Sequence, residues 1–248
     1  MPTETDHNIL IALLNKAADL ASQFSGGYSG EFMDAEEFHS ALADSIKKLK
    51  GGDSAQLEKL NSWFLPTSCW DDFVVIAGQP LANEISKLLI KMTDLQKAKK
   101  LFFNYDGSTF YMSRNGVEGE YQSYHIPDLL QNEWLNELRA EKLTVLNEPG
   151  NWKVVYFLNT HRQEGYLDQL ISVKPLGKFW EKCAYLETLL NYAINTQKPN
   201  QSQLPKLITF IADRINEMER TIKAAHSKQR IGGIKEQLEQ LKDGLKNK

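Results

Sequence analysis

The chain has 248 residues, of which 42% are hydrophobic and 25% charged, and its formal net charge at pH 7 is −3. These values are those of an ordinary globular protein that can bury a sizeable core, and they exclude disordered and collagen-like chains. The only two cysteines, Cys69 and Cys183, lie far apart in the sequence, which argues against a disulfide framework or a cysteine-based zinc site.

The N-terminal segment is acidic and leads directly into an amphipathic pattern, so it lacks the parts of a secretory signal. The longest clean apolar stretch covers residues 73–77, which is far shorter than the roughly 18 to 20 residues that cross a bilayer. We therefore expect a cytoplasmic protein with no membrane span.

Helical patterns fill the first hundred residues. Apolar side chains recur at helical spacing over residues 8–24, and Asp34 with Glu37 resembles a capping box for a second helix. Ser54 is placed to cap a third helix, and Pro80 suits the first turn of a fourth. These signals predict a helical layer.

The pattern changes period near residue 100 and predicts an antiparallel β-meander. Asp106-Gly107 stands between two aromatic runs, and Asn115-Gly116 offers a second turn of the same type, because these pairs adopt the positive φ that tight hairpins need. Both turns place the same side chains on one face of the sheet, with Phe110 opposite Phe103 across the first turn and opposite Tyr121 across the second. A helix is expected after Pro127, and the sheet of four to six strands is completed by segments at 142–146, 152–158 and 170–174.

The C-terminal part predicts helices again. A helix is expected after Gly177, and residues 195–203 form a polar linker. From Ile208 to Leu245 the apolar residues alternate in threes and fours, interrupted at Gly232-Gly233, which is typical of a helical hairpin or coiled coil. This stripe either pairs with a second copy, as a homodimer through residues 204–248, or packs back on the core of its own chain.

The predicted fold is therefore α+β, with an N-terminal helical layer, a central antiparallel β-meander sheet and a C-terminal helical hairpin. Four regions follow from it: a helical region at 1–99, an antiparallel sheet region with one inserted helix at 100–176, a helix and linker at 177–200, and the hairpin or coiled coil at 204–248.

Residues 63–73 are the most unusual segment, since they combine two tryptophans, a proline, Cys69 and the adjacent carboxylates Asp71 and Asp72. A functional interpretation gives the carboxylates acid–base or metal-binding roles and makes Cys69 a nucleophile. A structural interpretation needs less, because Ser68 and Asp71 can cap a short helix whose aromatic side chains pack in the core. Adjacent carboxylates on a helix point about 100° apart, which favours the structural interpretation. If the segment is a binding site, its candidate residues are Trp63, Trp70, Asp71 and Asp72.

Glu36 and His39 form a Glu-x-x-His pair, which places a carboxylate and an imidazole on one helical face, as in di-iron bundle sites. Such sites need a second copy of the motif and two further glutamates, each contributed by another helix of the bundle. A mononuclear metal site that combines Glu36 and His39 with Asp34, Asp71 or Asp72 is the alternative to a solvated acidic face.

Nucleic-acid binding and a bound cofactor are not expected. Phe102, Tyr111 and Tyr124 share the outer face of the predicted sheet, where aromatic rings can stack on bases, but Glu118 and Glu120 on that face would repel phosphates. The sequence also lacks a Gly-rich phosphate loop and any His-x-x-x-His pair.

The sequence favours a non-catalytic protein that acts through protein–protein contacts, with a protein partner or a second copy of itself. The alternative is a metal-dependent enzyme or small-ligand binder with an acidic pocket around Glu36, His39, Asp71 and Asp72. The two hypotheses differ in whether these four side chains converge beside a concave pocket.

Overall fold

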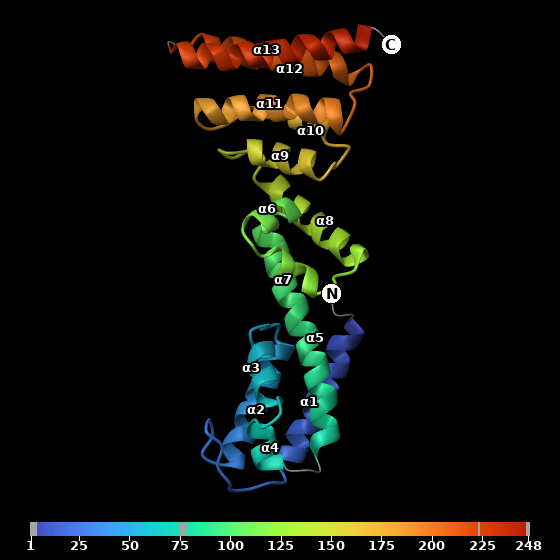
Figure 1. Cartoon of the computed structure of the whole chain (residues 1–248), viewed down its shortest axis with the longest axis vertical. Coiled ribbons are helices and arrows are strands. Elements are labelled where there is room, and N and C mark those ends of the chain that lie inside the picture. Colours follow the sequence, from blue (N-terminus) through green and yellow to red (C-terminus); the bar gives the residue numbers. More distant parts are fainter. Residues whose placement is uncertain (1–3, 75–77, 223, 247–248) are drawn as a thin grey trace. The chain divides into compact units, whose positions relative to one another are not determined.

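The structure is a computed structural model that describes residues 4–74, 78–222 and 224–246 (Figure 1). Every regular element among these residues is a helix, and none of them forms a strand. The predicted α+β fold with a central β-meander sheet is therefore wrong, and the fold is all-helical. The chain divides into two units, Met1–Trp134 and Leu135–Lys248.

Helices at the start of the first unit pack around one apolar core. They are α1 (Glu4–Ala21), α2 (Ala35–Lys50), α3 (Gln56–Trp63), α4 (Cys69–Val74) and α5 (Gln79–Asn104). α1 packs against both α2 and α5, and α3 fills the remaining side by packing against the same two helices. The helix predicted over residues 8–24 is α1.

The helix starts of this unit show which capping signals were correct. The Asp34 side chain accepts a hydrogen bond from the Glu37 N–H at 2.8 Å, as the predicted capping box requires. Pro80 lies in the first turn of α5, where its missing N–H costs nothing. The prediction that Ser54 caps α3 is wrong, because the N-cap residue is Ala55 and the side chain that accepts the Ala55 N–H, at 3.1 Å, is that of Asp53.

Short helices replace the predicted meander. Beyond α5 the chain continues through α6 (Thr109–Arg114), α7 (Glu118–Ser123) and α8 (Asp128–Thr144). Asp106 and Gly107 do adopt positive φ, at 51° and 70°, but they end a helix instead of closing a hairpin.

The hydrogen bonds after α5 are those of a Schellman motif. The Gly107 N–H donates to the Phe102 carbonyl oxygen at 2.7 Å, and the Asp106 N–H donates to the Phe103 carbonyl oxygen at 3.2 Å. The same motif follows α6, where Gly116 has a φ of 74°. Asp-Gly and Asn-Gly mark positive φ, and positive φ serves a helix end as well as a hairpin.

The remaining predicted strands are helical too. Residues 142–146 hold the end of α8, residues 152–158 lie in α9 (Trp152–Thr160), and residues 170–174 overlap α10 (Leu167–Ser172). The buried side chains of α9 are Val154, Val155, Phe157 and Leu158. Their spacing is that of one helix face, and a short β-branched and aromatic run does not by itself distinguish a buried strand from a buried helix.

The second unit is a stack of helices in two layers (Figure 1). After α9 and α10 it contains α11 (Phe179–Asn195), α12 (Gln203–Glu219) and α13 (Ala225–Lys246). α11 packs against α9 on one side and α13 on the other, while α12 packs against α10 and α13. Alternate helices therefore lie side by side, as in stacked helix-pair architectures.

Most of the apolar stripe of the C-terminal part is buried within the chain. The buried stripe residues are Ile211, Ile215 and Met218 on α12 and Ile234, Leu238 and Leu241 on α13, whereas Ile208 and Ile222 are half-buried and Ala225 is exposed. Gly232 and Gly233 lie inside α13, so the helix break predicted there is wrong. The side chain of Leu245 lies outside the described residues.

Within the part of the chain that the structure describes, no helix combines the length and apolar character that a membrane crossing requires.

Candidate functional site

The predicted acidic residues make local hydrogen bonds on two helices. Glu36 lies on α2 and accepts the Gly26 N–H at 3.0 Å. Asp71, on α4, accepts the Thr67 N–H at 2.7 Å and a second hydrogen bond from the side chain of Gln79. Glu36 thus holds the backbone at Gly26, and Asp71 holds the backbone at Thr67 and the start of α5.

The four residues of the hypothetical acidic pocket do not form a metal-binding group. Among the described residues, no three His, Cys, Asp or Glu side chains are grouped so that they could hold a metal ion. This applies to Glu36 and His39 on α2 together with Asp34, Asp71 or Asp72.

A concave pocket does lie beside one of them. A cavity of about 280 Å³ between α4 and α5 is lined by Asp71, but Glu36, His39 and Asp72 do not line it. Its other lining residues are Phe64, Pro66, Gln79, Ala82, Asn83, Ser86 and Lys87.

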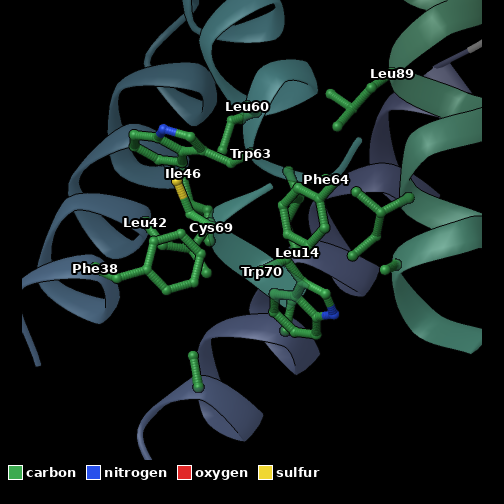
Figure 2. Close-up of a cluster of buried hydrophobic side chains, with 14 of the residues drawn as sticks. Leu14, Phe38, Leu42, Ile46, Leu60, Trp63, Phe64, Cys69, Trp70 and Leu89 are labelled. Carbon is green, nitrogen blue, oxygen red and sulfur yellow. The ribbon is translucent and has the colours of Figure 1, made fainter. Parts of the chain in front are cut away.

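Trp63 and Trp70 are core residues (Figure 2). Only 1% of Trp63 and 0% of Trp70 is exposed, and both rings lie edge-on to the Phe38 ring, at centroid distances of 5.8 and 6.5 Å. The Trp63 indole N–H donates to Glu31 at 2.9 Å. Burial raises the pKa of the Cys69 thiol, which disfavours the thiolate that a nucleophile needs. The segment 63–73 therefore has the packing that the structural interpretation describes.

The second unit carries an exposed aromatic cluster that we call the aromatic ridge: Trp152, Tyr156 and Trp180. The Trp152 ring packs edge-on against Trp180 at a centroid distance of 5.8 Å and against Tyr156 at 6.3 Å. Trp180 is 46% exposed and Tyr156 is 39% exposed. The N-terminal halves of α9 and α11 therefore share an aromatic surface that meets solvent.

A cavity in the second unit, which we call the cationic pocket, has a volume of about 480 Å³. It is bounded by the segment before α11, the start of α11 and the end of α12. Its lining residues are Lys174, Pro175, Leu176, Phe179, Lys182, Arg214, Glu217, Met218 and Thr221. Three of these carry positive charge and one carries negative charge.

One buried residue fixes a wall of this pocket. Asn151 is 1% exposed, and its Nδ2 atom donates to the carbonyl oxygens of Leu146 at 3.0 Å and Lys174 at 2.9 Å. Its Oδ1 atom accepts the Leu176 N–H at 3.2 Å. The backbone on both sides of Pro175 is thereby held in place.

Sequence reasoning missed both features. Trp152 and Tyr156 were assigned to a strand, so their shared helix face was not visible. Trp180 gave a usable signal, because it lies off the apolar stripe of its predicted helix. The cationic pocket gave none, since Lys174 and Arg214 are brought together only by the packing of α12 on α10.

Comparisons of the chain with protein-family models, with curated proteins and with solved structures find no match. The assignment of function therefore rests on the geometry of these sites.

Proposed function

We propose that this chain is a non-catalytic binding protein that holds another protein against the aromatic ridge. One observation carries the proposal: Trp180 and Tyr156 are both exposed, and both pack against the Trp152 ring. Scattered exposed apolar residues are normal, but adjoining aromatic side chains on two helices are typical of interfaces.

The support beneath the ridge favours binding. α9 and α11 pack closely, and the side chains between them include the fully buried Val155, Leu158, Leu186 and Leu190. A ridge on such a base is held in position before a partner arrives. Tryptophan and tyrosine also lose little conformational entropy on binding, because each has only two side-chain torsions.

The stacked helices of the second unit support the same function. Arrays of helix pairs present extended surfaces that bind proteins in many unrelated families.

The test compares the wild-type chain with Trp180→Ala as bait in an extract of the source cells, followed by calorimetry with the purified partner. We expect Trp180→Ala to weaken binding about thirtyfold, because a central aromatic anchor contributes about 2 kcal/mol. Ile194→Ala is the matched control, since Ile194 is 40% exposed on the same helix but lies near its other end.

A partner that binds Trp180→Ala and wild type equally would contradict the proposal. Sedimentation of the two proteins without extract covers the case in which the partner is a second copy: self-association of the wild type that Trp180→Ala removes would place the ridge in a homodimer.

A further inference from the structure

We propose that the cationic pocket binds a small organic anion with an apolar body, headed by a carboxylate or a phosphate. The inference rests on the cavity in the second unit and is independent of the aromatic ridge.

The charges of the pocket favour an anionic head. Arg214 is paired with Glu217: the Nη1 atom of Arg214 lies 2.7 Å from the Oε2 atom of Glu217. Lys174 and Lys182 form no ion pair with any described residue. The only acid in the lining is therefore already neutralised, and two ammonium groups are left for a ligand.

The geometry of Arg214 limits what it can offer. Its Nε atom is buried without a hydrogen-bond partner among the described residues, and its Nη1 atom is occupied by Glu217. A bidentate grip through the guanidinium fork is thus not free, so the head is held by the lysines as point charges. A lysine ammonium group is a point charge that donates hydrogen bonds to the oxygen atoms of either a carboxylate or a phosphate, which is why both heads fit.

The rest of the lining is apolar and suits a hydrocarbon body. Pro175, Leu176, Phe179 and Met218 come from three different parts of the second unit and surround the cavity. The volume of about 480 Å³ lies within the range of small-molecule pockets, roughly 300 to 1,000 Å³. Each methylene group that such a lining removes from water raises affinity by about two- to fourfold.

The pocket is also built to keep its shape. Asn151 fixes the backbone at Lys174 and Leu176 through two hydrogen bonds, so the wall that carries one lysine and two apolar side chains is anchored to a buried residue. A ligand therefore meets a preformed site and loses little affinity to ordering the protein.

The experiment is calorimetric titration of the full chain with octanoate, octyl phosphate, octanol and butanoate. We expect at least one of the two eight-carbon anions to bind with a Kd of about 1 mM or below. Octanol, which lacks the charge, should bind about tenfold more weakly, and butanoate, which lacks four methylene groups, should bind more weakly by about fifteenfold or more. The stronger of the two anions identifies the head.

Variants separate the pocket from general adsorption. Lys182→Gln and Lys174→Gln should each weaken the anion about fivefold and leave octanol unchanged, because each removes one ammonium group from the lining. Lys206→Gln is the control, since Lys206 is exposed on α12 and does not line the pocket. Circular dichroism checks that every variant is folded.

Two results would overturn the inference. One is that octanol, octanoate and octyl phosphate all bind with the same affinity. The other is anion binding that both Lys182→Gln and Lys174→Gln retain at the wild-type level.

Discussion

Asn151 donates a hydrogen bond from Nδ2 to the carbonyl oxygen of Lys174, at 2.9 Å, across a separation of 23 residues. The same side chain also bonds to Leu146 and Leu176, so one buried amide joins three backbone segments. A buried backbone group that loses its partner pays the full cost of desolvation, which makes such a residue a sensitive point of the fold.

Replacing this amide should destabilise the protein strongly. Asn151→Ala is expected to lower the free energy of unfolding by about 3 kcal/mol, because three hydrogen bonds are lost and their buried backbone partners stay unpaired. Urea denaturation measures the change. Asn147→Ala is the control, since Asn147 is exposed nearby and should shift the midpoint little. A similar small shift for Asn151→Ala would mean that water replaces the amide.

The two glycines that end α5 and α6 make a matched pair. Gly107 and Gly116 have almost equal φ, 70° and 74°, but a Cβ at Gly107 would lie 2.7 Å from Phe102 Cζ, whereas one at Gly116 would meet nothing within 4 Å. Both alanine variants should lose about 1 kcal/mol from backbone strain, and Gly107→Ala should lose about 1 to 2 kcal/mol more from the clash. Thermal melts compare them, and equal losses would show that the Phe102 ring moves aside freely.

These glycines also explain how far the sequence could predict the fold. Period and capping signals located α1, α2 and α5, because a long apolar stripe with Asp34 or Pro80 at its start has one interpretation. Asp106-Gly107 has two, since the same positive φ ends a helix or turns a hairpin. The choice depends on whether Phe102 and Phe103 belong to a long helix, and the aromatic run around them hides that periodicity.

The candidate sites divide in the same way. The core role of Trp63 and Trp70 was available as an alternative from local sequence, because their segment has helical capping signals. The role of Asn151 was not, since its partners Lys174 and Leu176 lie more than twenty residues away and a backbone carbonyl leaves no mark in the sequence. Sites assembled by the stacking of helices are outside the reach of short-range patterns.

Tyr192 should make the second unit sensitive to alkali. Its ring is fully buried, its hydroxyl lies 2.7 Å from the Gln163 carbonyl oxygen, and burial raises its pKa from 10 to about 12. Since the folded state holds the phenol proton more tightly, the stabilisation is complete below about pH 10 and is lost as the pH rises to about 12.

The measurement compares urea denaturation of wild type and Tyr192→Phe over this pH range. Near pH 8 the variant should be less stable by about 1 to 2 kcal/mol, because it lacks the hydroxyl hydrogen bond. Above pH 10 the difference should shrink by about 1.4 kcal/mol per pH unit, since only the wild type has this phenol to ionise. Tyr28→Phe, at an exposed residue, should track the wild type throughout; a constant difference for Tyr192→Phe would contradict the raised pKa.

The last prediction concerns how α13 is attached. Arg230 on α13 donates from Nε and Nη2 to the two carboxylate oxygens of Glu187 on α11, at 2.8 and 2.7 Å. The two side chains are 34% and 30% exposed, so solvent screens the pair in part. A bidentate pair of this kind, fixed between two packed helices, should still show a coupling energy of about 1 kcal/mol.

A double-mutant cycle with Glu187→Gln and Arg230→Gln measures that coupling by urea denaturation. The control cycle uses Lys242 and Glu239, which are 2.6 Å apart but lie three residues from each other on the exposed face of α13, where coupling should be about 0.5 kcal/mol or less.

Repeating the wild-type melt over about a hundredfold range of concentration distinguishes packing within the chain from the homodimer predicted through residues 204–248, because only exchange of helices between copies makes the midpoint rise with concentration. Since α13 buries Ile231, Ile234 and Leu238 in the packing described above, we expect a constant midpoint and a coupling that belongs to one chain; a rising midpoint would mean that α13 docks on the α11 of a second copy.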